Sequence, residues 1–428
     1  MASQTLRLVS KTQYDQQVFI NLNPNDLGPL GPDSIRVKTE TVGLTANNLA
    51  YCAAGEVLKW WYSYPIPSFV PAPYNDPSTY GISPGWGFCR IVESNIPSIK
   101  PGTTIYGFCP ISSFPVDLQL KQSEHDESQW HEVSPHRQQL MPLYNRYSYG
   151  AYECERNSPT GTEWTVAIRP IWTCGYLLNR LVFPSSKEQK PVHPIPDFGL
   201  PWSEADGDLT SSIVVALGAG SKTSRSFVHQ LATNRTGRMP KALVEVTLGK
   251  GAGEFVKSFP FEHKVVSYSE LSSAENIAWT TNLGASRIVV LDFAGRGNAH
   301  EELYDALQEA GSKLPYSLIF IGGESKVYAP EDLAARYNIP AKLNSTRCNT
   351  SGMREVAIQQ LGEKTFFKQL TEAFNGVVAE QLALGENKVL GVSPHHGGGL
   401  TGDNSLEEYW KKLCSGSLSG NIGYLFDI

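Results

Sequence analysis

The sequence predicts an α/β protein in two parts, a β-barrel followed by a parallel sheet with helices on both faces. Three observations support this prediction. Short β-branched and aromatic runs, separated by glycine and proline clusters, occupy the chain to about residue 150. From residue 212 onward, short apolar runs alternate with segments of helical periodicity. At the start of this second pattern, an apolar run ends at Gly218 and Gly220 and continues as an amphipathic helix.

Length and composition limit the classes of protein to consider. The chain has 428 residues, which is too long for one ordinary core, and 41% of them are hydrophobic. The net charge of −6 argues against nucleic-acid binding, because no basic excess is present to neutralise phosphates. The seven cysteines include no C-x-x-C pair, so we expect reduced thiols rather than a metal ribbon or a disulfide framework.

Two further patterns concern the compartment. The first residues lack the apolar stretch of a signal peptide. No apolar run approaches the ~20 residues that a membrane span needs. We therefore expect a cytoplasmic protein with no membrane partner.

The first half contains the predicted barrel strands, at 18–22, 34–42, 87–94 and 103–109. Residues 60–86 form an aromatic and proline-rich loop, which must fold against a core, a partner or a ligand. A polar stretch at 121–137 is expected to be a solvated loop, because the spacing of its three histidines matches no standard metal motif. The apolar residues 163–183 predict a strand that leads into a buried helix, and 184–210 predict a linker or surface loop.

The second half predicts five parallel strands, at 213–217, 242–248, 264–268, 287–292 and 318–322. Helices are expected between several of them, at 222–236, 252–258, 272–283 and 299–311. This alternation indicates a Rossmann-type fold, in which ligands bind at the carboxyl ends of the strands. The tail from residue 355 is expected to be helical and to pack back onto the barrel.

The turn after the first of these strands is the candidate cofactor loop. Gly218 and Gly220 permit a tight turn and a close backbone approach, as in the dinucleotide-binding pattern G-x-G-x-x-G, but Thr223 stands where that pattern has its third glycine. Ser221, Lys222 and Thr223 offer two hydroxyls and a positive charge to a phosphate. The alternative is a helix cap that binds no ligand.

Cofactor choice depends on the tip of the second strand. An NAD site would have an acidic residue there, whereas this chain has Lys250, which could meet the 2′-phosphate of NADP. Lys250 fits a solvated turn lysine equally well. Glu245 lies inside the strand rather than at its end.

Several segments resemble the medium-chain dehydrogenase/reductase superfamily. They include Val42-Gly-Leu-Thr-Ala-Asn-Asn48, the strand pair that begins at Gly87 and Thr103, and the strand ends Val290-Leu-Asp-Phe-Ala-Gly295 and Ile319-Phe-Ile-Gly-Gly323. The resemblance implies a GroES-like barrel domain at 1–183 and a Rossmann-like nucleotide-binding domain at 184–355. A helical segment at 356–428 would then return to the first domain.

A narrower set of segments is similar to a branch of these proteins that has no assigned function and occurs in bacteria and fungi. These segments are Pro84-Gly-Trp-Gly-Phe88, Tyr144-Asn-Arg-Tyr147, Arg169-Pro-Ile-Trp-Thr-Cys-Gly-Tyr-Leu-Leu178 and Ser221-Lys-Thr223. The resemblance implies that the altered loop is a feature of the branch. The resemblance implies a fold more than a function.

The zinc site of alcohol dehydrogenases of this superfamily has no counterpart in the pattern. Cys52 stands near the place of the first ligand, but no His-Glu pair follows, and a four-cysteine lobe is absent from the sequence. The pair His395-His396 predicts an exposed or ligand-facing turn. We therefore expect no bound metal.

Zinc-free members of the superfamily use a tyrosine or asparagine near the barrel cleft. The matching residues are Asn48, to orient a substrate oxygen, and Tyr51, to donate the proton. Tyr147 and Thr173 are expected to line the same cleft. An apolar wall for the substrate is expected from Trp60, Trp61, Tyr64 and Trp86. Each of these residues has an ordinary structural role as its alternative.

The leading hypothesis is a zinc-independent, NADPH-dependent reductase of an enone, quinone or carbonyl small molecule. The second is a non-redox lyase, isomerase or cyclase on the same fold, with a modified or empty cofactor loop. The third is a non-enzymatic member of a larger assembly. A homodimer through the edge of the Rossmann sheet fits each of them.

Overall fold

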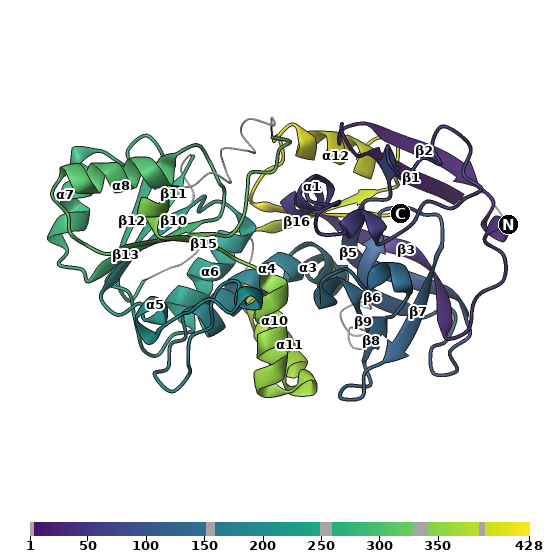
Figure 1. Cartoon of the computed structure of the whole chain (residues 1–428), viewed down its shortest axis with the longest axis horizontal. Helices are drawn as coiled ribbons and strands as arrows, with labels where there is room; N and C mark the ends of the chain where they lie inside the picture. Colours follow the sequence, from purple (N-terminus) through teal and green to yellow (C-terminus); the bar gives the residue numbers. More distant parts are fainter. Residues whose placement is uncertain (1–3, 151–158, 249–258, 329–339, 385–389) are drawn as a thin grey trace. The chain divides into compact units, whose positions relative to one another are not determined.

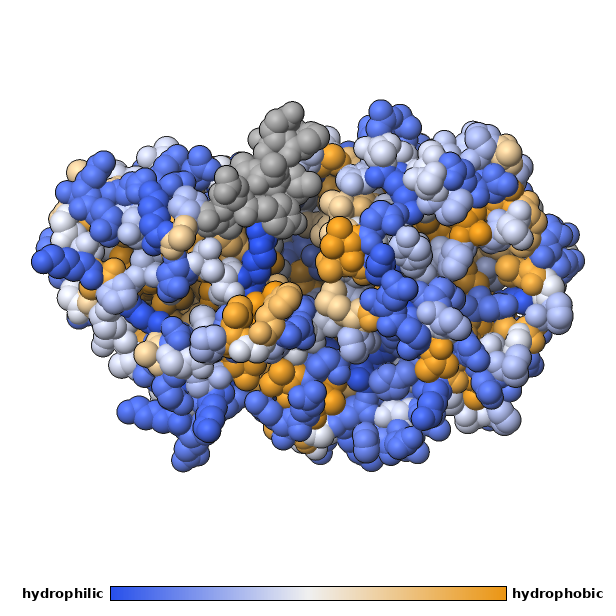
Figure 2. Space-filling view, viewed as in Figure 1, coloured by the Kyte–Doolittle hydropathy of each residue, from blue (hydrophilic) through white to orange (hydrophobic). Residues whose placement is uncertain are grey.

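The computed structural model describes residues 4–150, 159–248, 259–328, 340–384 and 390–428 (Figure 1). The chain forms two compact units. The first comprises Met1–Pro170, Ser325–Val327 and Pro394–Ile428, and the second comprises Ile171–Glu324 and Tyr328–Ser393. Hydrophilic side chains predominate on the face seen in Figure 2, with smaller hydrophobic patches between them.

A closed antiparallel barrel is the centre of the first unit, which confirms the predicted β-barrel. The strands follow one another around the ring in the order β3 (Ser34–Leu44), β5 (Pro84–Ser94), β6 (Thr104–Pro110), β9 (Arg146–Tyr149), β8 (Gln129–Glu132) and β7 (Val116–Gln122). Pairing of β7 with β3 closes the ring. Closure leaves these six strands without an open barrel edge.

Local sequence features explain how the barrel strands curl. The register of β3 against β5 shifts at two places, between Arg36 and Val37 and between Thr39 and Thr41. Such irregularities bend a strand and increase its twist. A Cβ atom at Gly87 would lie 2.1 Å from the carbonyl oxygen of Thr41, so glycine is needed where β5 crosses β3 most closely.

Other elements of the first unit surround the barrel. A second sheet has the order β2 (Gln17–Leu22), β1 (Gln4–Ser10) and β4 (Tyr80–Gly81). The chain returns to this unit at its end, through β16 (Ser393–Gly398), α12 (Leu406–Cys414) and β17 (Ile422–Asp427). Strand β17 pairs with β3, and Tyr424 stands opposite Leu44. The helices of this unit include α1 (Ala46–Ala53) and α3 (Pro159–Ala167), with short 3₁₀ turns η1 (Pro24–Leu27), η2 (Trp60–Tyr62), η3 (Pro135–Arg137) and η4 (Pro142–Asn145).

The second unit contains a parallel sheet of six strands. Their order is β12 (Glu262–Ser267), β11 (Ala242–Thr247), β10 (Ser212–Leu217), β13 (Arg287–Asp292), β14 (Tyr316–Phe320) and β15 (Ser345–Arg347). Numbered along the chain from β10, this is the order 3-2-1-4-5-6 of a Rossmann sheet. The five predicted strands are confirmed. The sixth, β15, was not predicted, because three polar residues carry no strand pattern.

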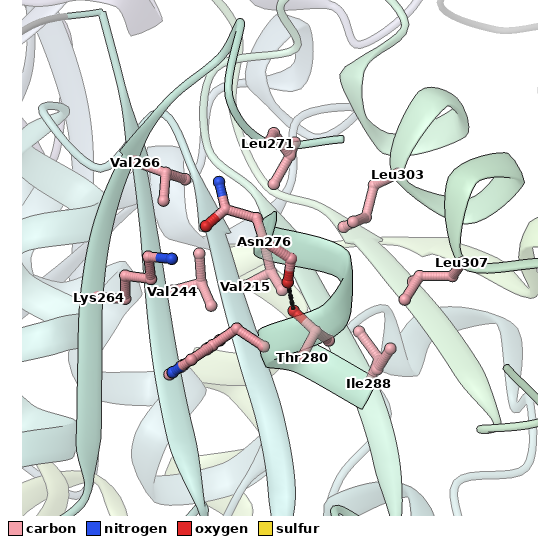
Figure 3. A pocket seen from close by; sticks show the side chains of 11 residues that line it. Val215, Val244, Lys264, Val266, Leu271, Asn276, Thr280, Ile288, Leu303 and Leu307 are labelled. Carbon is pink, nitrogen blue, oxygen red and sulfur yellow. Dashed lines mark hydrogen bonds between the residues drawn. The ribbon is translucent and has the colours of Figure 1, made fainter. Parts of the chain in front are cut away.

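Helices cover both faces of this sheet. Helices α7 (Ala274–Asn282) and α8 (Ala299–Glu309) share one apolar core with alternate residues of the strands, among them Val215, Val244 and Ile288. Side chains of this core line a cavity of about 10 Å³, which has room for about one water molecule. Figure 3 shows these side chains. The right-handed crossover from β10 to β11 places α6 (Lys222–Thr233) on the other face. The remaining helices of this unit include α4 (Arg169–Leu177), α5 (Glu204–Gly207), α10 (Thr350–Leu361) and α11 (Glu363–Leu384), with the 3₁₀ turns η6 (Pro196–Phe198) and η7 (Ala341–Leu343).

Two sequence expectations were wrong. Residues 163–183 form no strand, because α3 is followed by α4 and then by a π-helical turn, η5 (Leu178–Val182). This run is buried almost throughout, and periodicity cannot separate a buried helix from a buried strand. Residues 121–137 form a solvated loop only at 123–128, because β8 and η3 bury Trp130, Glu132 and Arg137. The predicted helix at 252–258 lies outside the described residues.

Among the helices in the described parts of the chain, none has both the length and the apolar composition needed to cross a membrane.

Candidate functional site

The candidate cofactor loop leaves the carboxyl end of β10 as a tight turn. The backbone N–H groups of Gly218 and Ala219 both donate to the carbonyl oxygen of Val246 in β11, over 3.1 and 2.9 Å. Gly218 has a φ angle of +75°, and a Cβ atom there would lie 2.4 Å from the Cβ of Ala294. Glycine is therefore required at this position by both backbone conformation and space.

The loop remains open beside Gly220. A Cβ atom at this position would have Thr247 Oγ1 as its nearest neighbour, at 4.0 Å. Ser221 is the N-cap of α6, and its Oγ accepts a hydrogen bond from the N–H of Ser224 over 3.2 Å. The start of α6 thus presents its positive end beside a glycine that leaves room for a ligand.

Two cationic side chains lie at the start of α6. Burial, and then the charge of Arg225, lower the pKa of Lys222 to about 8. Arg225 donates through Nε to the carbonyl oxygen of Gly220 over 3.1 Å and through Nη1 to that of Leu390 over 3.1 Å. A phosphate bound here would favour the charged form of Lys222. Side-chain chemistry and space at this end of the helix therefore fit a dinucleotide phosphate.

Gly322 lies just beyond β14, at the same carboxyl edge of the sheet. Its N–H donates to the carbonyl oxygen of Asp292 over 3.2 Å. A Cβ atom at this position would lie 2.5 Å from the carbonyl oxygen of Phe293. Its place is set by close packing of two strand ends. Lys250, the residue expected to select NADP, lies outside the described residues. Glu245 is fully buried in β11, and its Oε1 lies 2.9 Å from Nε2 of His263.

A group of rings in the first unit contains three predicted site residues. We call Tyr51, Trp60, Trp86, Phe108 and Tyr144 the aromatic cluster. The ring of Tyr51 meets those of Trp60 and Phe108 edge-on, with centroids 4.9 and 5.0 Å apart. Trp86 Nε1 donates to the Tyr51 hydroxyl oxygen over 3.1 Å. Burial raises the pKa of Tyr51 to about 12, so its hydroxyl stays protonated at neutral pH.

Tyr64 and Tyr147 belong to a second, more polar group beside the aromatic cluster. Their hydroxyl oxygens are 2.9 Å apart, and both hydroxyls donate to the carbonyl oxygen of Phe108. The buried Arg137 donates through Nη2 to the Tyr147 hydroxyl over 3.3 Å. Burial raises the pKa of both tyrosines. Sequence reasoning missed Arg137, because it lies in a polar stretch with no apolar alternation to indicate burial.

A family model described as "Protein of unknown function (DUF2855)" matches residues 42–419. The chain belongs to the DUF2855 family. No curated protein matches it by sequence.

Solved structures with the same fold cover the whole of the DUF2855 chain and are covered wholly by it. A mutant enoyl thioester reductase from Candida tropicalis has a TM-score of 0.54 at 12% identity. The mitochondrial 2-enoyl thioester reductase Etr1p/Etr2p heterodimer from the same organism has a TM-score of 0.54 at 13% identity. The complex of Etr1p with NADP and crotonyl-CoA has a TM-score of 0.53 at 13% identity. The fold predicted from the medium-chain dehydrogenase/reductase resemblance, a GroES-like barrel with a Rossmann-type sheet, is thereby confirmed.

Asn48 has a structural place in the DUF2855 barrel unit. Its Oδ1 accepts from the N–H of Thr45 over 2.7 Å, which completes a capping box at the start of α1. Its Nδ2 donates to the carbonyl oxygen of Pro84 over 3.0 Å. These bonds tie α1 to β5 and thereby fix where the Tyr51 side chain stands.

Trp61 and Thr173 are not members of the aromatic cluster. Trp61 packs in a different apolar core with Cys52 and Trp410. Thr173 is buried on α4, which belongs to the second unit, whereas Tyr51 and Tyr147 belong to the first. Within the second unit, Ser226 Oγ donates over 2.8 Å to the carbonyl oxygen next to Thr173, that of Trp172, so α4 packs on α6.

The residues considered as metal ligands have other surroundings. Burial raises the pKa of the Cys52 thiol to about 12. His395 and His396 lie in β16 rather than in a turn, where Nε2 of His396 is 2.9 Å from Asp427 Oδ2. Within the described parts of the chain, no three histidine, cysteine or acidic side chains gather closely enough to hold a metal ion.

Proposed function

We propose that this DUF2855 protein is a zinc-independent, NADPH-dependent reductase of an enone, quinone or carbonyl small molecule. The start of α6 carries the proposal, because Lys222, Arg225 and the open side of Gly220 meet at the carboxyl edge of a 3-2-1-4-5-6 sheet. Etr1p, which has the same fold, forms a complex with NADP and crotonyl-CoA, and this supports the choice of cofactor.

Each part of the loop has a separate task in binding. Gly220 lets the pyrophosphate approach the backbone, and Lys222 offsets its charge. Thr223, in the first turn of α6, adds a hydroxyl. Bound NADPH would supply the hydride, which none of the protein's own side chains can do.

Tyr51 is the proposed proton donor. Its hydroxyl oxygen already accepts from Trp86, and its raised pKa keeps the O–H proton in place at neutral pH. Tyr147 suits this task less well, because its hydroxyl donates to the carbonyl oxygen of Phe108 over 2.7 Å. Trp60 and Trp86 would give a flat substrate an apolar wall beside Tyr51.

A nucleotide titration tests the proposal most directly. NADPH and NADH are titrated into the folded full chain by calorimetry, and we expect saturable binding with NADPH the tighter. Quinone and enone substrates are then offered with NADPH, and its oxidation is followed by absorbance. Absence of binding at millimolar NADPH would contradict the proposal.

A non-redox lyase, isomerase or cyclase is the second candidate. It is favoured by the internal bonding of the loop, since Val246 takes the N–H groups of Gly218 and Ala219, and Ser221 caps α6. A loop of this kind can serve as a helix cap alone. Turnover of a substrate in the absence of any nicotinamide nucleotide would support this candidate and exclude the first.

A homodimer is proposed as the assembly. Strand β15 is the edge strand of the described sheet on one side and is only three residues long. A second copy could extend the sheet there. Light scattering during gel filtration measures the mass, and a monomer at micromolar concentration would contradict the proposal.

A further inference from the structure

The first unit contains a cavity that the proposed reductase chemistry does not use. Its volume is about 290 Å³, near the lower end of the range for small-molecule sites. Its walls come from β1, η1, the segment 63–69 and the connection from β6 to β7. Tyr64 is the one predicted site residue in its lining, and no residue of the aromatic cluster takes part.

One end of the cavity is polar and offers acceptors. Glu132 and Ser63 line it, and both are almost fully buried. Glu132 Oε2 and Ser63 Oγ have no hydrogen-bond partner, although Oε2 lies 3.7 Å from Nε of Arg137. Buried polar atoms normally have a partner. A hydrogen-bond donor on a ligand at this end would supply it.

Arg137 does not make this end an anion site. Its three nitrogen atoms already donate, Nε to Asn145 over 3.0 Å, Nη1 to the Ser63 carbonyl oxygen over 3.1 Å and Nη2 to that of Tyr144 over 2.6 Å. Its charge is also offset by Glu132. An anionic ligand would therefore lie near the Glu132 carboxylate, and no uncompensated cation would be present to pair with the ligand.

The other charged groups at the cavity are compensated as well. Asp117 is held by Arg36, with Nε to Oδ1 at 2.7 Å and Nη2 to Oδ2 at 3.0 Å. Burial lowers the pKa of His136, so its ring is neutral at pH 7. The charges that face the cavity thus leave no excess of positive charge.

The remaining walls are apolar. Leu27, Ile66, Ile82, Phe69 and Phe114 form them, and the rings of the last two meet edge-on at 6.1 Å. Apolar walls of this kind suit an aromatic or hydrocarbon body.

We propose that this cavity binds a small neutral molecule that is apolar along most of its length and carries one O–H or N–H donor at one end. The donor faces Glu132 and Ser63, and the apolar part lies against Ile66, Phe69 and Phe114. The cavity is a binding site separate from the proposed nucleotide site, and the proposal holds whether or not the protein is a reductase.

Three probes of matched shape test the site, namely phenol, benzene and benzoate, each titrated into the full chain by NMR. One net hydrogen bond predicts that phenol binds about threefold to tenfold more tightly than benzene. Benzoate should bind most weakly. Absence of saturable phenol binding, equal binding of phenol and benzene, or tightest binding of benzoate would each overturn the proposal.

A cavity-filling variant and a matched control test whether phenol binds in this cavity. Ile66→Trp fills it from a partly exposed wall and should abolish phenol binding. Val92→Trp, at an exposed position of β5, is the matched control and should leave binding unchanged. If the filling variant does not fold, Ser63→Ala should reduce the advantage of phenol over benzene. Unchanged phenol binding in folded Ile66→Trp, or an unchanged advantage in Ser63→Ala, would refute the site.

Discussion

Trp86 Nε1 donates a hydrogen bond to the hydroxyl oxygen of Tyr51 over 3.1 Å. The two residues come from different elements, β5 and α1, and Asn48 ties these elements together through its bond to the Pro84 carbonyl oxygen. The Tyr51 hydroxyl is therefore oriented by a rigid framework rather than by a loop.

Removal of the Tyr51 hydroxyl should stop most of the chemistry. Tyr51→Phe is expected to lower kcat about 10²–10⁴-fold, the usual contribution of a positioned proton donor. NADPH affinity should not change, because the substitution leaves the loop residues Gly220 and Lys222 intact. The control is Tyr62→Phe, at a tyrosine that is 45% exposed. Equal rates for the Tyr51→Phe variant and the control would rule out Tyr51 as donor.

Tyr51 should also contribute to alkaline unfolding. Its pKa is raised by burial from 10.0 to about 12, so the native state keeps its proton while the unfolded state loses it. The resulting stability is present below pH 10 and is lost as the pH rises towards 12. Urea unfolding across this window should therefore show a smaller loss of stability in Tyr51→Phe than in the parent protein. A steeper loss in the variant would argue against this assignment.

Lys222→Met should weaken nucleotide binding. Loss of a charged hydrogen bond to phosphate predicts about 10-fold to 100-fold weaker NADPH binding. In the parent, affinity should fall as the pH rises through about 8, where Lys222 loses its proton, and the variant should lack this dependence. Lys313→Met, at an exposed lysine of the same unit, is the control. A pH dependence that survives in Lys222→Met would assign it to another group.

Lys222 should also lower the free energy of unfolding of the nucleotide-free protein. Its folded pKa is lowered by burial from 10.5, so the folded state holds the ammonium unfavourably below pH 8. Lys222→Met should therefore raise the free energy of unfolding at pH 7, with a smaller gain as the pH approaches 10.5. Calorimetric melting of the nucleotide-free protein measures this, and a lower Tm at pH 7 would contradict it.

The two glycines of the loop should respond differently to alanine. Gly218→Ala forces a side chain into a positive φ and against Ala294, so it should cost more than about 1 kcal/mol of stability. Gly220→Ala meets open space and should leave stability unchanged, but it should weaken NADPH binding if the pyrophosphate approaches this backbone. Unaltered NADPH affinity in Gly220→Ala would place the phosphate elsewhere.

The buried Arg137 should be costly to remove. Arg137→Met leaves Glu132 charged and buried without its cation, which predicts a loss of about 3–5 kcal/mol in the free energy of unfolding. Arg90→Met removes a partly exposed partner of Glu40 and should cost at most about 1 kcal/mol. Urea titrations compare the two variants. Similar unfolding midpoints would show that the buried charge of Glu132 does not need Arg137 for its compensation.

The sequence predicted the second unit better than the first because its signals are local. Strands β10, β11, β13 and β14 are short apolar runs, and helices that begin after the capping residues Ser221 and Ser273 follow β10 and β12. Strand β15 has no such signal, since its pairing with β14 alone makes it a strand. In the barrel, β7 does alternate apolar and polar residues, whereas β8 has Trp130 as its one apolar residue and is a strand through its pairing with β7 and β9.

The sequence predicted which types of residue form the candidate site, but not which way their side chains point. Trp60 and Trp61 are neighbours in a 3₁₀ turn, where successive side chains point about 120° apart, and they enter different cores. Phe108 and Tyr144 complete the aromatic cluster from strand and turn positions that carry no distinguishing pattern. Tertiary packing decides which of two adjacent aromatic residues faces a site. A single sequence does not contain this information.

The pairing of β17 with β3 has a consequence for how the protein is made. Asp427 stands opposite Thr41 and Tyr424 opposite Leu44, so the end of β3 at 41–44 lacks this partner until β17 has been synthesised. During synthesis the second unit emerges between Met1–Pro170 and Pro394–Ile428 of the first, so it can fold before β17 has been made. The first unit is therefore completed only after the second unit has been made, although its barrel strands come first in the chain.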